Sequence, residues 1–313
     1  LYEAKIKNMG NAGRNGGEYY TPRPLIKAIV DVVNPQIGET VYDAASGSAG
    51  FLCEAYEHMR TSKDLTTKEV EILQKRTFYG KEKKSLAYVI GTMNMILHGV
   101  DAPNIVHTNT LSENLSDVQE KDRYDVVLAN PPFGKKSAMS FTNEEGEQEK
   151  DDLTYNRQDF WATTSNKQLN FVQHIRTMLK TTGKAAVVVP DNVLFEGGAG
   201  ETVRRKLLET TDLHTILRLP TGIFYANGVK ANVLFFDNHE ASKEPWTKEV
   251  WYYDYRTNIH HTLKKKPLRF EDLQEFITCY NPLNRHQRKE TWNEQNNPEG
   301  RWRKYSFDQI MAR

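Results

Sequence analysis

The sequence predicts a doubly wound α/β fold, with a seven-stranded mixed sheet and an antiparallel hairpin at one edge. Short β-branched runs alternate with segments of helical periodicity between residues 22 and 219, which is the pattern of βαβ units. The last two strand-like runs are joined by a turn at 220–222, which leaves no room for a helix and implies antiparallel pairing. With 313 residues, the chain can bury the core of one large domain or of one and a half.

Each predicted element follows from its local sequence. A Gly- and Asn-rich lead-in over residues 1–16 precedes a helix, which Thr21 can cap with Pro22 in its first position. A short strand over 40–45 then breaks into the small-residue turn 46–50, and a helix follows over 51–60. Such a turn lets a ligand approach the backbone closely, and the N–H groups of the following helix can face a polar ligand.

The alternation of strands and helices continues to residue 237. The predicted strands are 77–80, 104–108, 124–129, 185–189, 213–219 and 232–237, and the predicted helices are 83–98, 166–180 and 200–209. Ligands in doubly wound sheets bind beyond the carboxyl ends of the strands. We therefore expect the Gly47 turn, Glu82, Asn109 and Asn130, which follow four of these strands, to converge on one site.

Composition narrows the class of protein. Only two cysteines occur, Cys53 and Cys279, without metal-ligand spacing or disulfide density, which indicates a reducing compartment and no metal site. The sequence has no signal peptide and no apolar stretch of about 18 residues. We therefore expect a soluble cytoplasmic protein, and the start at Leu1 indicates a processed chain or a fragment. The net charge of +1 does not by itself demand nucleic acid.

The turn at 46–50 argues against two classes of nucleotide-binding enzyme. It lacks the dinucleotide fingerprint G-x-G-x-x-G because position 52 is Leu, and it lacks the lysine of a phosphate-binding loop. Enzymes that use nicotinamide cofactors and ATPases are therefore disfavoured.

The tetrapeptide Asn130-Pro131-Pro132-Phe133 ends the strand 124–129 and has the composition of an active-site turn. Neither proline offers an N–H to a sheet ladder, and both restrict the backbone, so the turn is rigid. The turn can therefore hold the Asn130 side-chain oxygen and a free backbone carbonyl in fixed positions relative to a ligand. Phe133 offers a stacking face. An ordinary Asn-Pro turn is the alternative.

The motifs stand together in the order of a known family. They are Gly17-Glu18-Tyr19-Tyr20-Thr21-Pro22-Arg23, Asp43 to Phe51, Phe78 to Glu82, Asn130 to Phe133, and Leu219 to Phe224. In this order the sequence resembles the adenine-specific DNA methyltransferases of the gamma arrangement, and most closely the modification subunit of type I restriction-modification systems. The resemblance covers roughly residues 14 to 240. It implies the Rossmann-like fold of the methyltransferases that depend on S-adenosylmethionine.

The resemblance also implies the site residues. The residues expected to bind S-adenosylmethionine are Tyr20, Thr21, Asp43, Ser46, Gly47, Gly50, Phe51, Glu82, Asn109 and Asn130. The expected catalytic residues are Asn130, Pro131, Pro132 and Phe133, and Phe133 and Phe224 are expected to contact a flipped-out adenine. From the residues alone, Asp43 could instead stabilise the turn as an Asx residue, Glu82 could be a helix-start acid, and Phe224 could belong to the core.

The reaction implied by the resemblance is methyl transfer to the N6 amine of adenine in double-stranded DNA. The implied partners are a specificity subunit, a restriction subunit and a second copy of the modification subunit. The cofactor loop departs from the family pattern at three positions, with Ala44 for Pro, Ser46 for Cys and Ala49 for Gly, and Asn109 stands where Asp is common. These changes concern the affinity for the cofactor more than the fold.

The expected domain organisation has three parts. Residues 1–16 form a flexible lead-in, residues 17–240 form the catalytic domain with a mobile loop at 134–168, and residues 241–313 form an extension that could contact a partner or DNA. The N-terminal helical domain usual in the family is expected to be absent. Two alternative functions stay open: a methyltransferase acting on RNA or on a protein glutamine, and a catalytically weak scaffold subunit.

Overall fold

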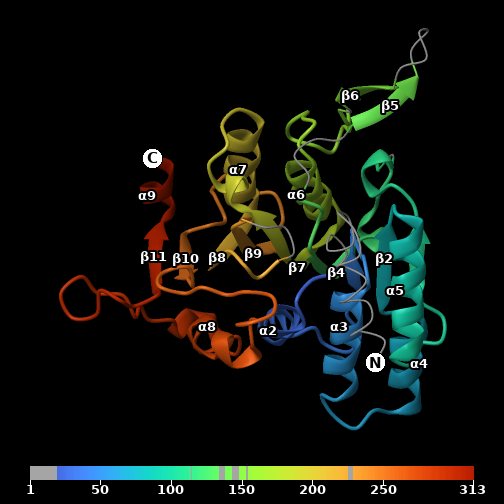
Figure 1. Ribbon diagram of the computed structural model, residues 1–313, viewed down its shortest axis with the longest axis horizontal. Helices are drawn as coiled ribbons and strands as arrows, with labels where there is room; N and C mark the ends of the chain where they lie inside the picture. Colours follow the sequence, from blue (N-terminus) through green and yellow to red (C-terminus); the bar gives the residue numbers. More distant parts are fainter. Residues whose placement is uncertain (1–19, 114, 134–137, 143–147, 153, 225–227) are drawn as a thin grey trace.

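The chain folds around a nine-stranded mixed sheet (Figure 1). The structure is a computed structural model, and it describes residues 20–113, 115–133, 138–142, 148–152, 154–224 and 228–313. The strand order is β11-β10-β8-β9-β7-β4-β1-β2-β3. The strands are β1 (Val41–Asp43), β2 (Phe78–Glu82), β3 (Asn104–His107), β4 (Tyr124–Ala129), β7 (Leu179–Pro190), β8 (Thr211–Leu219), β9 (Ala231–Asn238), β10 (Glu249–Asp254) and β11 (Trp302–Ser306). The fold class predicted from the alternating pattern is confirmed.

Helices cover both faces of the sheet, with α6 and α7 on one side and α2, α3 and α8 on the other (Figure 1). The helices are α2 (Arg23–Val33), α3 (Gly50–Arg60), α4 (Thr67–Lys75), α5 (Ser85–Leu97), α6 (Lys167–Met178), α7 (Ala199–Thr210), α8 (Gln274–Tyr280) and α9 (Phe307–Met311). Each face buries its own apolar cluster because successive strand residues point to opposite sides. No helix among the described residues is both long and apolar enough to span a bilayer.

The parallel part of the sheet positions the candidate site. Strands β7, β4, β1, β2 and β3 are parallel neighbours, so their carboxyl ends meet at one edge. The register pairs Asp43 with Gly80, and Val41 with Val126. The turns that follow β1, β2, β3 and β4 therefore lie side by side, as the sequence predicted for the Gly47 turn, Glu82, Asn109 and Asn130.

Two details of the predicted sheet are wrong. The sheet has nine strands rather than seven, because β10 and β11 come from the segment 241–313 that was expected to lie outside the catalytic fold. The antiparallel pair β8 and β9 is therefore not at an edge, since β10 pairs with β8 in parallel and β11 closes this side. The many charged and polar residues of the segment hid its two strands.

The stretch 134–168 also contains more regular structure than expected. Within it, β5 (Ala138–Thr142) and β6 (Gln148–Asp152) form a separate antiparallel pair that projects from the body of the molecule (Figure 1). Residues 134–137, 143–147 and 153, like the lead-in 1–16, lie outside the described part of the chain. The proposed domain boundaries stay predictions, although the sheet itself continues past residue 240.

Candidate active site

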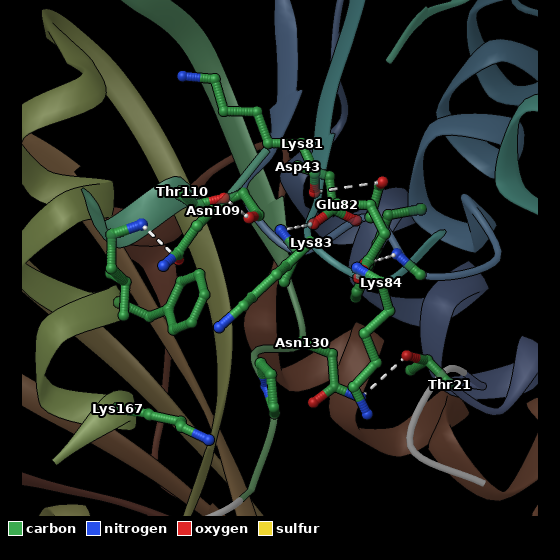
Figure 2. A pocket seen from close by; sticks show the side chains of 18 of the residues that line it. Thr21, Asp43, Lys81, Glu82, Lys83, Lys84, Asn109, Thr110, Asn130 and Lys167 are labelled. Atoms are coloured by element: carbon green, nitrogen blue, oxygen red, sulfur yellow. Dashed lines mark hydrogen bonds between the residues drawn. The ribbon is translucent and has the colours of Figure 1, made fainter. Parts of the chain in front are cut away.

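A cavity of about 230 Å³ opens at the carboxyl ends of β1, β2 and β4 (Figure 2). Its lining includes ten of the residues that the sequence assigned to a site, namely Thr21, Asp43, Ser46, Gly47, Gly50, Phe51, Glu82, Asn109, Asn130 and Pro132. Segments more than 100 residues apart in the chain thus line the same cavity. The roles of these residues stay predictions.

Asn130 has one end of its side-chain amide fixed and the other end open. Its Nδ2 donates a hydrogen bond of 2.9 Å to Thr21 Oγ1, and Figure 2 shows the oxygen on the side away from Thr21. That oxygen, Oδ1, is buried and has no hydrogen-bond partner within the described residues. A buried acceptor without a hydrogen-bond partner destabilises the folded chain by about 1–3 kcal/mol. The Asn130 oxygen is therefore in position to accept a hydrogen bond from a ligand.

The contact with Thr21 corrects a local prediction. Thr21 does not cap α2, since the helix begins at Arg23 with Pro22 as the N-cap residue and without a side-chain cap. The Thr21 hydroxyl instead accepts from Asn130, 109 residues away in the sequence. A tertiary partner has replaced the local capping bond.

Helix α6 supports the same turn from another side. Gln168 Nε2 donates to the Pro132 carbonyl at 2.9 Å. Asn166 caps α6, because its side-chain oxygen accepts from the backbone N–H groups of Gln168 and Leu169. The proline turn is therefore rigid for two reasons, its own restricted backbone and a bond to a capped helix.

Glu82 ties the end of β2 to the small-residue turn. One carboxylate oxygen accepts from the Gly47 N–H at 2.9 Å and the other accepts from the Lys84 N–H at 2.9 Å. The side chain is 8% exposed and borders the cavity. A carboxylate has about four lone-pair directions, so each oxygen keeps one for a ligand hydroxyl. Gly47 itself has a φ of 51°, in the left-handed region that favours glycine.

Asp43 combines a structural bond with an unusual protonation state. One of its oxygens accepts from the Ala45 N–H at 3.0 Å, which is the Asx arrangement that the sequence left open. Burial, and to a smaller extent the nearby Glu82 charge, raise the pKa of Asp43 to about 8. The carboxyl therefore keeps its proton at neutral pH, and the floor of the cavity carries less negative charge than its residue types suggest.

Asn109 meets a residue that the sequence did not suggest. Its Nδ2 donates to Tyr155 Oη at 3.2 Å, and its side-chain oxygen accepts from the Leu111 N–H at 3.3 Å. Tyr155 follows the strand β6 and reaches the cavity from a stretch that had no recognisable pattern. Both ends of the Asn109 amide therefore have a partner before any ligand binds.

Other lining residues were also missed. They are Lys81, Lys83, Lys84, Thr110, Leu111, Lys167 and Phe171 together with the backbone of the turn. Lys83 and Lys84 directly follow Glu82 at the end of a predicted strand, so their position could have been inferred. Lys81 differs from the other lysines because its side chain extends away from Asn130 and pairs with Glu113 (Figure 2).

Four predicted site residues do not line the cavity: Tyr20, Pro131, Phe133 and Phe224. The Phe133 and Phe224 rings pack edge to face with centroids 5.4 Å apart. Phe224 is 5% exposed and belongs to the apolar cluster on the α2, α3 and α8 side of the sheet. This position agrees with the alternative that Phe224 is a core residue. A role of either ring in contacting a base stays a prediction.

The described part of the chain has no group of three or more His, Cys, Asp or Glu side chains placed to hold a metal ion.

Comparison with known proteins places this site in a family. The model of the family described as N-6 DNA Methylase matches residues 1–301. The chain belongs to the N-6 DNA methylase family. The chain is 40% identical over 295 residues to the type I restriction enzyme EcoKI methylase subunit of Escherichia coli K12 and, equally, to the StySPI methylase subunit of Salmonella potsdam. Each alignment covers 90% of this chain and 52% of the relative, so the chain spans about half the length of the relatives it matches.

Solved structures agree with this family assignment. The crystal structure of the EcoKI M protein is 37% identical, with a TM-score of 0.79 over 94% of this chain and 64% of that chain. A structure from the type I R-M system is 35% identical, with a TM-score of 0.82 over 99% of this chain and 60% of that chain. A Listeria monocytogenes protein described as a candidate class I S-adenosylmethionine-dependent methyltransferase shares the fold alone, at 16% identity and a TM-score of 0.54.

Proposed function

We propose that this member of the N-6 DNA methylase family transfers a methyl group from S-adenosylmethionine to the N6 amine of a flipped-out adenine in DNA. The observation that carries the proposal is the buried Asn130 Oδ1, which has no partner among the described residues and whose amide Thr21 holds in place. A buried oxygen without a partner can accept a hydrogen bond from the N–H group of an amine. The catalytic machinery is assigned to residues 17–240.

The residues around the cavity fit the proposed cofactor. S-adenosylmethionine, when bound, supplies an electrophilic methyl group on sulfur. Glu82 keeps lone pairs for two ribose hydroxyls, and the Gly47 turn presents a backbone without a side chain. Asn109 presents a polar edge for an adenine ring, oriented by Tyr155. Asp43, neutral at pH 7, adds no second full negative charge beside Glu82.

The chain's own groups would prepare the amine. The lone pair of an adenine amino group is delocalised into the ring, so the nitrogen is a poor nucleophile. Asn130 Oδ1 and the Pro131 carbonyl would each accept one N–H, which favours a pyramidal nitrogen with its lone pair directed at the methyl donor. No strong base is needed, because the nitrogen becomes acidic as it is methylated. Phe133 would stack on the extruded base.

The proposed setting is a type I restriction-modification complex in the cytoplasm. Relatives at 40% identity are named methylase subunits of type I restriction enzymes. The proposed partners are double-stranded DNA, a specificity subunit, a restriction subunit and a second methylase subunit. No base-reading module is evident in the sequence, so the chain alone would bind DNA only through weak, salt-sensitive phosphate contacts.

Replacing Asn130 tests the proposed function. Asn130→Ala removes the open acceptor and leaves the proline-fixed backbone, so we expect the single-turnover rate of adenine methylation by the assembled complex to fall roughly a hundred- to a thousand-fold. Affinity for S-adenosylmethionine, measured by calorimetry, should fall far less than the rate, because Asn130 is one of several cavity residues expected to bind the cofactor. Asn104→Ala is the matched control, because Asn104 begins β3, does not line the cavity, and its side-chain amide donates to the Lys75 carbonyl. Near-wild-type turnover by Asn130→Ala would show that the turn is only structural.

A further inference from the structure

A network of polar side chains fixes the segment that follows β6 to helix α6. The Arg157 guanidinium donates two hydrogen bonds to the Asp159 carboxylate, from Nε to Oδ1 at 2.9 Å and from Nη2 to Oδ2 at 2.6 Å. Thr177 on α6 donates to the same Oδ2 at 2.6 Å. The Arg157 side chain is 7% exposed. Because a buried charge is costly without a partner, this ion pair holds the segment in one position.

Arg157 also bonds to His174, and this bond decides which ring nitrogen carries the proton. Nη1 of Arg157 lies 3.1 Å from His174 Nδ1, and His174 Nε2 lies 2.9 Å from the Tyr42 hydroxyl oxygen. A guanidinium can only donate, so Nδ1 accepts and the Nε2–H donates to Tyr42. Burial and the Arg157 charge lower the pKa of His174 well below its usual range, so the ring stays neutral. The network therefore runs from the segment through α6 to β1.

The anchored segment carries Tyr155 into the cavity. Tyr155 lies two residues before Arg157, is 9% exposed and lines the cavity. Its hydroxyl accepts a hydrogen bond from Asn109 Nδ2 at 3.2 Å, while the Asn109 oxygen accepts from the Leu111 N–H at 3.3 Å. The Asn109 amide is thus held at both ends. One N–H and one lone pair of this amide remain for a ligand.

We propose that residues 155–159 form a positioning element of the cofactor site. Tyr155 holds Asn109 in the orientation that meets the adenine ring of S-adenosylmethionine, and the Arg157 anchor holds Tyr155 in place. The inference rests on the proposed function, because it concerns the same cofactor. None of the sequence motifs that assigned the site includes these residues. A side chain that is oriented before the ligand arrives loses less conformational freedom on binding, so the network raises the affinity.

Removal of the Tyr155 hydroxyl tests the contact with Asn109. Tyr155→Phe keeps the ring, so the affinity of the isolated chain for S-adenosylmethionine, measured by calorimetry, should fall roughly three- to tenfold, the loss expected for one neutral hydrogen bond. Added to Asn109→Ala, the same change should lower the affinity no further, because Tyr155 acts through Asn109. Tyr79→Phe is the control, since Tyr79 is half-buried on β2 and does not line the cavity. Its affinity should equal that of the wild-type chain.

Removal of the Arg157 guanidinium tests the anchor. In Arg157→Met the segment loses its ion pair and its bond to His174. The backbone amides of residues 154–160 should therefore exchange hydrogen for deuterium faster, and the cofactor affinity should fall at least as far as in Tyr155→Phe. Arg123→Met is the control, because Arg123 pairs with Glu120 and does not line the cavity. Tyr155→Phe leaves the ion pair of Arg157 intact, so the first test stands even where Arg157→Met unfolds.

The outcomes separate this inference from the proposed function. Full affinity in Tyr155→Phe, or an equal further loss when this change is added to Asn109→Ala, would overturn the inference and leave the proposed function standing. So would normal exchange and affinity in Arg157→Met. A wild-type chain that does not bind S-adenosylmethionine would refute both, whereas binding without methylation of adenine would refute only the proposed reaction.

Discussion

Glu82 has two roles at the cavity: it holds the backbone around the cavity in place, and it is proposed to bind the ribose hydroxyls of S-adenosylmethionine. Its two oxygens already hold the Gly47 and Lys84 N–H groups, so its position does not depend on a ligand. Glu82→Ala should weaken binding of S-adenosylmethionine by about 1.5–3 kcal/mol, the range for hydrogen bonds to a charged group. Calorimetry measures this directly. The control is Glu113→Ala, because Glu113 pairs with Lys81; equal losses in the two variants would remove Glu82 from the cofactor site.

The raised pKa of Asp43 predicts that the free energy of unfolding decreases as the pH rises from about 4 to about 8. Its pKa is raised to about 8 in the folded chain, against about 4 when unfolded, so the folded state binds the proton more tightly. The stability from this group is fully present below about pH 4 and is lost as the pH rises through 8. Asp43→Asn keeps an acceptor for the Ala45 N–H and removes the titration.

Urea unfolding of the wild-type chain and of Asp43→Asn between pH 5 and pH 9 measures this difference. We expect the stability of the variant relative to wild type to increase with pH over this interval. A constant difference between the two chains would show that Asp43 ionises as freely as in the unfolded state.

At the scale of single residues, sequence reasoning predicted which side chains meet at one cavity, while their roles stay predictions. Asn130, Glu82 and Asp43 were identified because a strand end and a motif coincide at each. The partners that orient them were not identified. Thr21 lies 109 residues from Asn130, and Tyr155 lies 46 residues from Asn109. Such bonds depend on how distant segments pack, and no local pattern encodes them.

Helix α5 packs closely against the small-residue turn 46–50 at one glycine, Gly91. Ala normally stabilises a helix interior relative to Gly by about 0.5–1 kcal/mol. At Gly91 a methyl group would lie 2.6 Å from the Gly47 carbonyl oxygen and 3.4 Å from the Ala49 nitrogen. Gly91→Ala should therefore lower the free energy of unfolding by about 1–3 kcal/mol, the cost of overpacking, and should also weaken cofactor binding by displacing the turn.

Thr92→Ala is the matched control for Gly91→Ala. It lies next in the same helix and removes a buried hydroxyl that has no partner within the described residues. We expect its stability to be unchanged or slightly increased. A Gly91→Ala chain that is as stable as Thr92→Ala and binds S-adenosylmethionine normally would refute the close contact.

At the scale of elements, the parallel strands were predicted because apolar runs and helices alternate strictly there. Strands β10 and β11 were missed for a physical reason. Tyr252 and Asp254 on β10, and Arg303 and Tyr305 on β11, interrupt the apolar pattern, yet Trp251, Tyr253 and Trp302 are buried. Long aromatic and Arg side chains can cover apolar surface while their polar ends reach water, so composition understated this part of the core.

A partly buried cluster of charged and polar side chains joins the segment beyond residue 240 to the sheet. Arg285 pairs with Asp237 on β9, and His214 on β8 lies 3.6 Å from the same carboxylate. Burial lowers the pKa of His214 to about 4. Burial by itself would raise the pKa of Asp237, but the contacts with His214 and Arg285 outweigh it and lower this pKa below its usual range. Arg288 donates to the Tyr280 carbonyl at 2.6 Å and to Thr215 Oγ1 at 2.8 Å. Residues beyond 240 are therefore bonded into the central strands.

Trp302 tests whether the chain unfolds as one unit. It is fully buried on β11, and its ring stacks on Trp251 with centroids 5.2 Å apart. Trp302→Ala should lower the free energy of unfolding by about 3–5 kcal/mol, the usual cost of removing a large buried aromatic side chain. Since β11 belongs to the same sheet as β1, which leads into the turn 46–50, we expect a single transition at a lower urea concentration. Circular dichroism and loss of cofactor binding should report the same midpoint.

The control is Trp292→Ala, because Trp292 is only half-buried and its ring lies under the Arg303 guanidinium. A loss near 1 kcal/mol is expected there, comparable to an exposed cation–π contact. If residues 241–313 instead formed an independent unit, Trp302→Ala would produce two transitions and cofactor binding would survive the first. The continuous sheet order from β11 to β3 predicts that this separation does not occur.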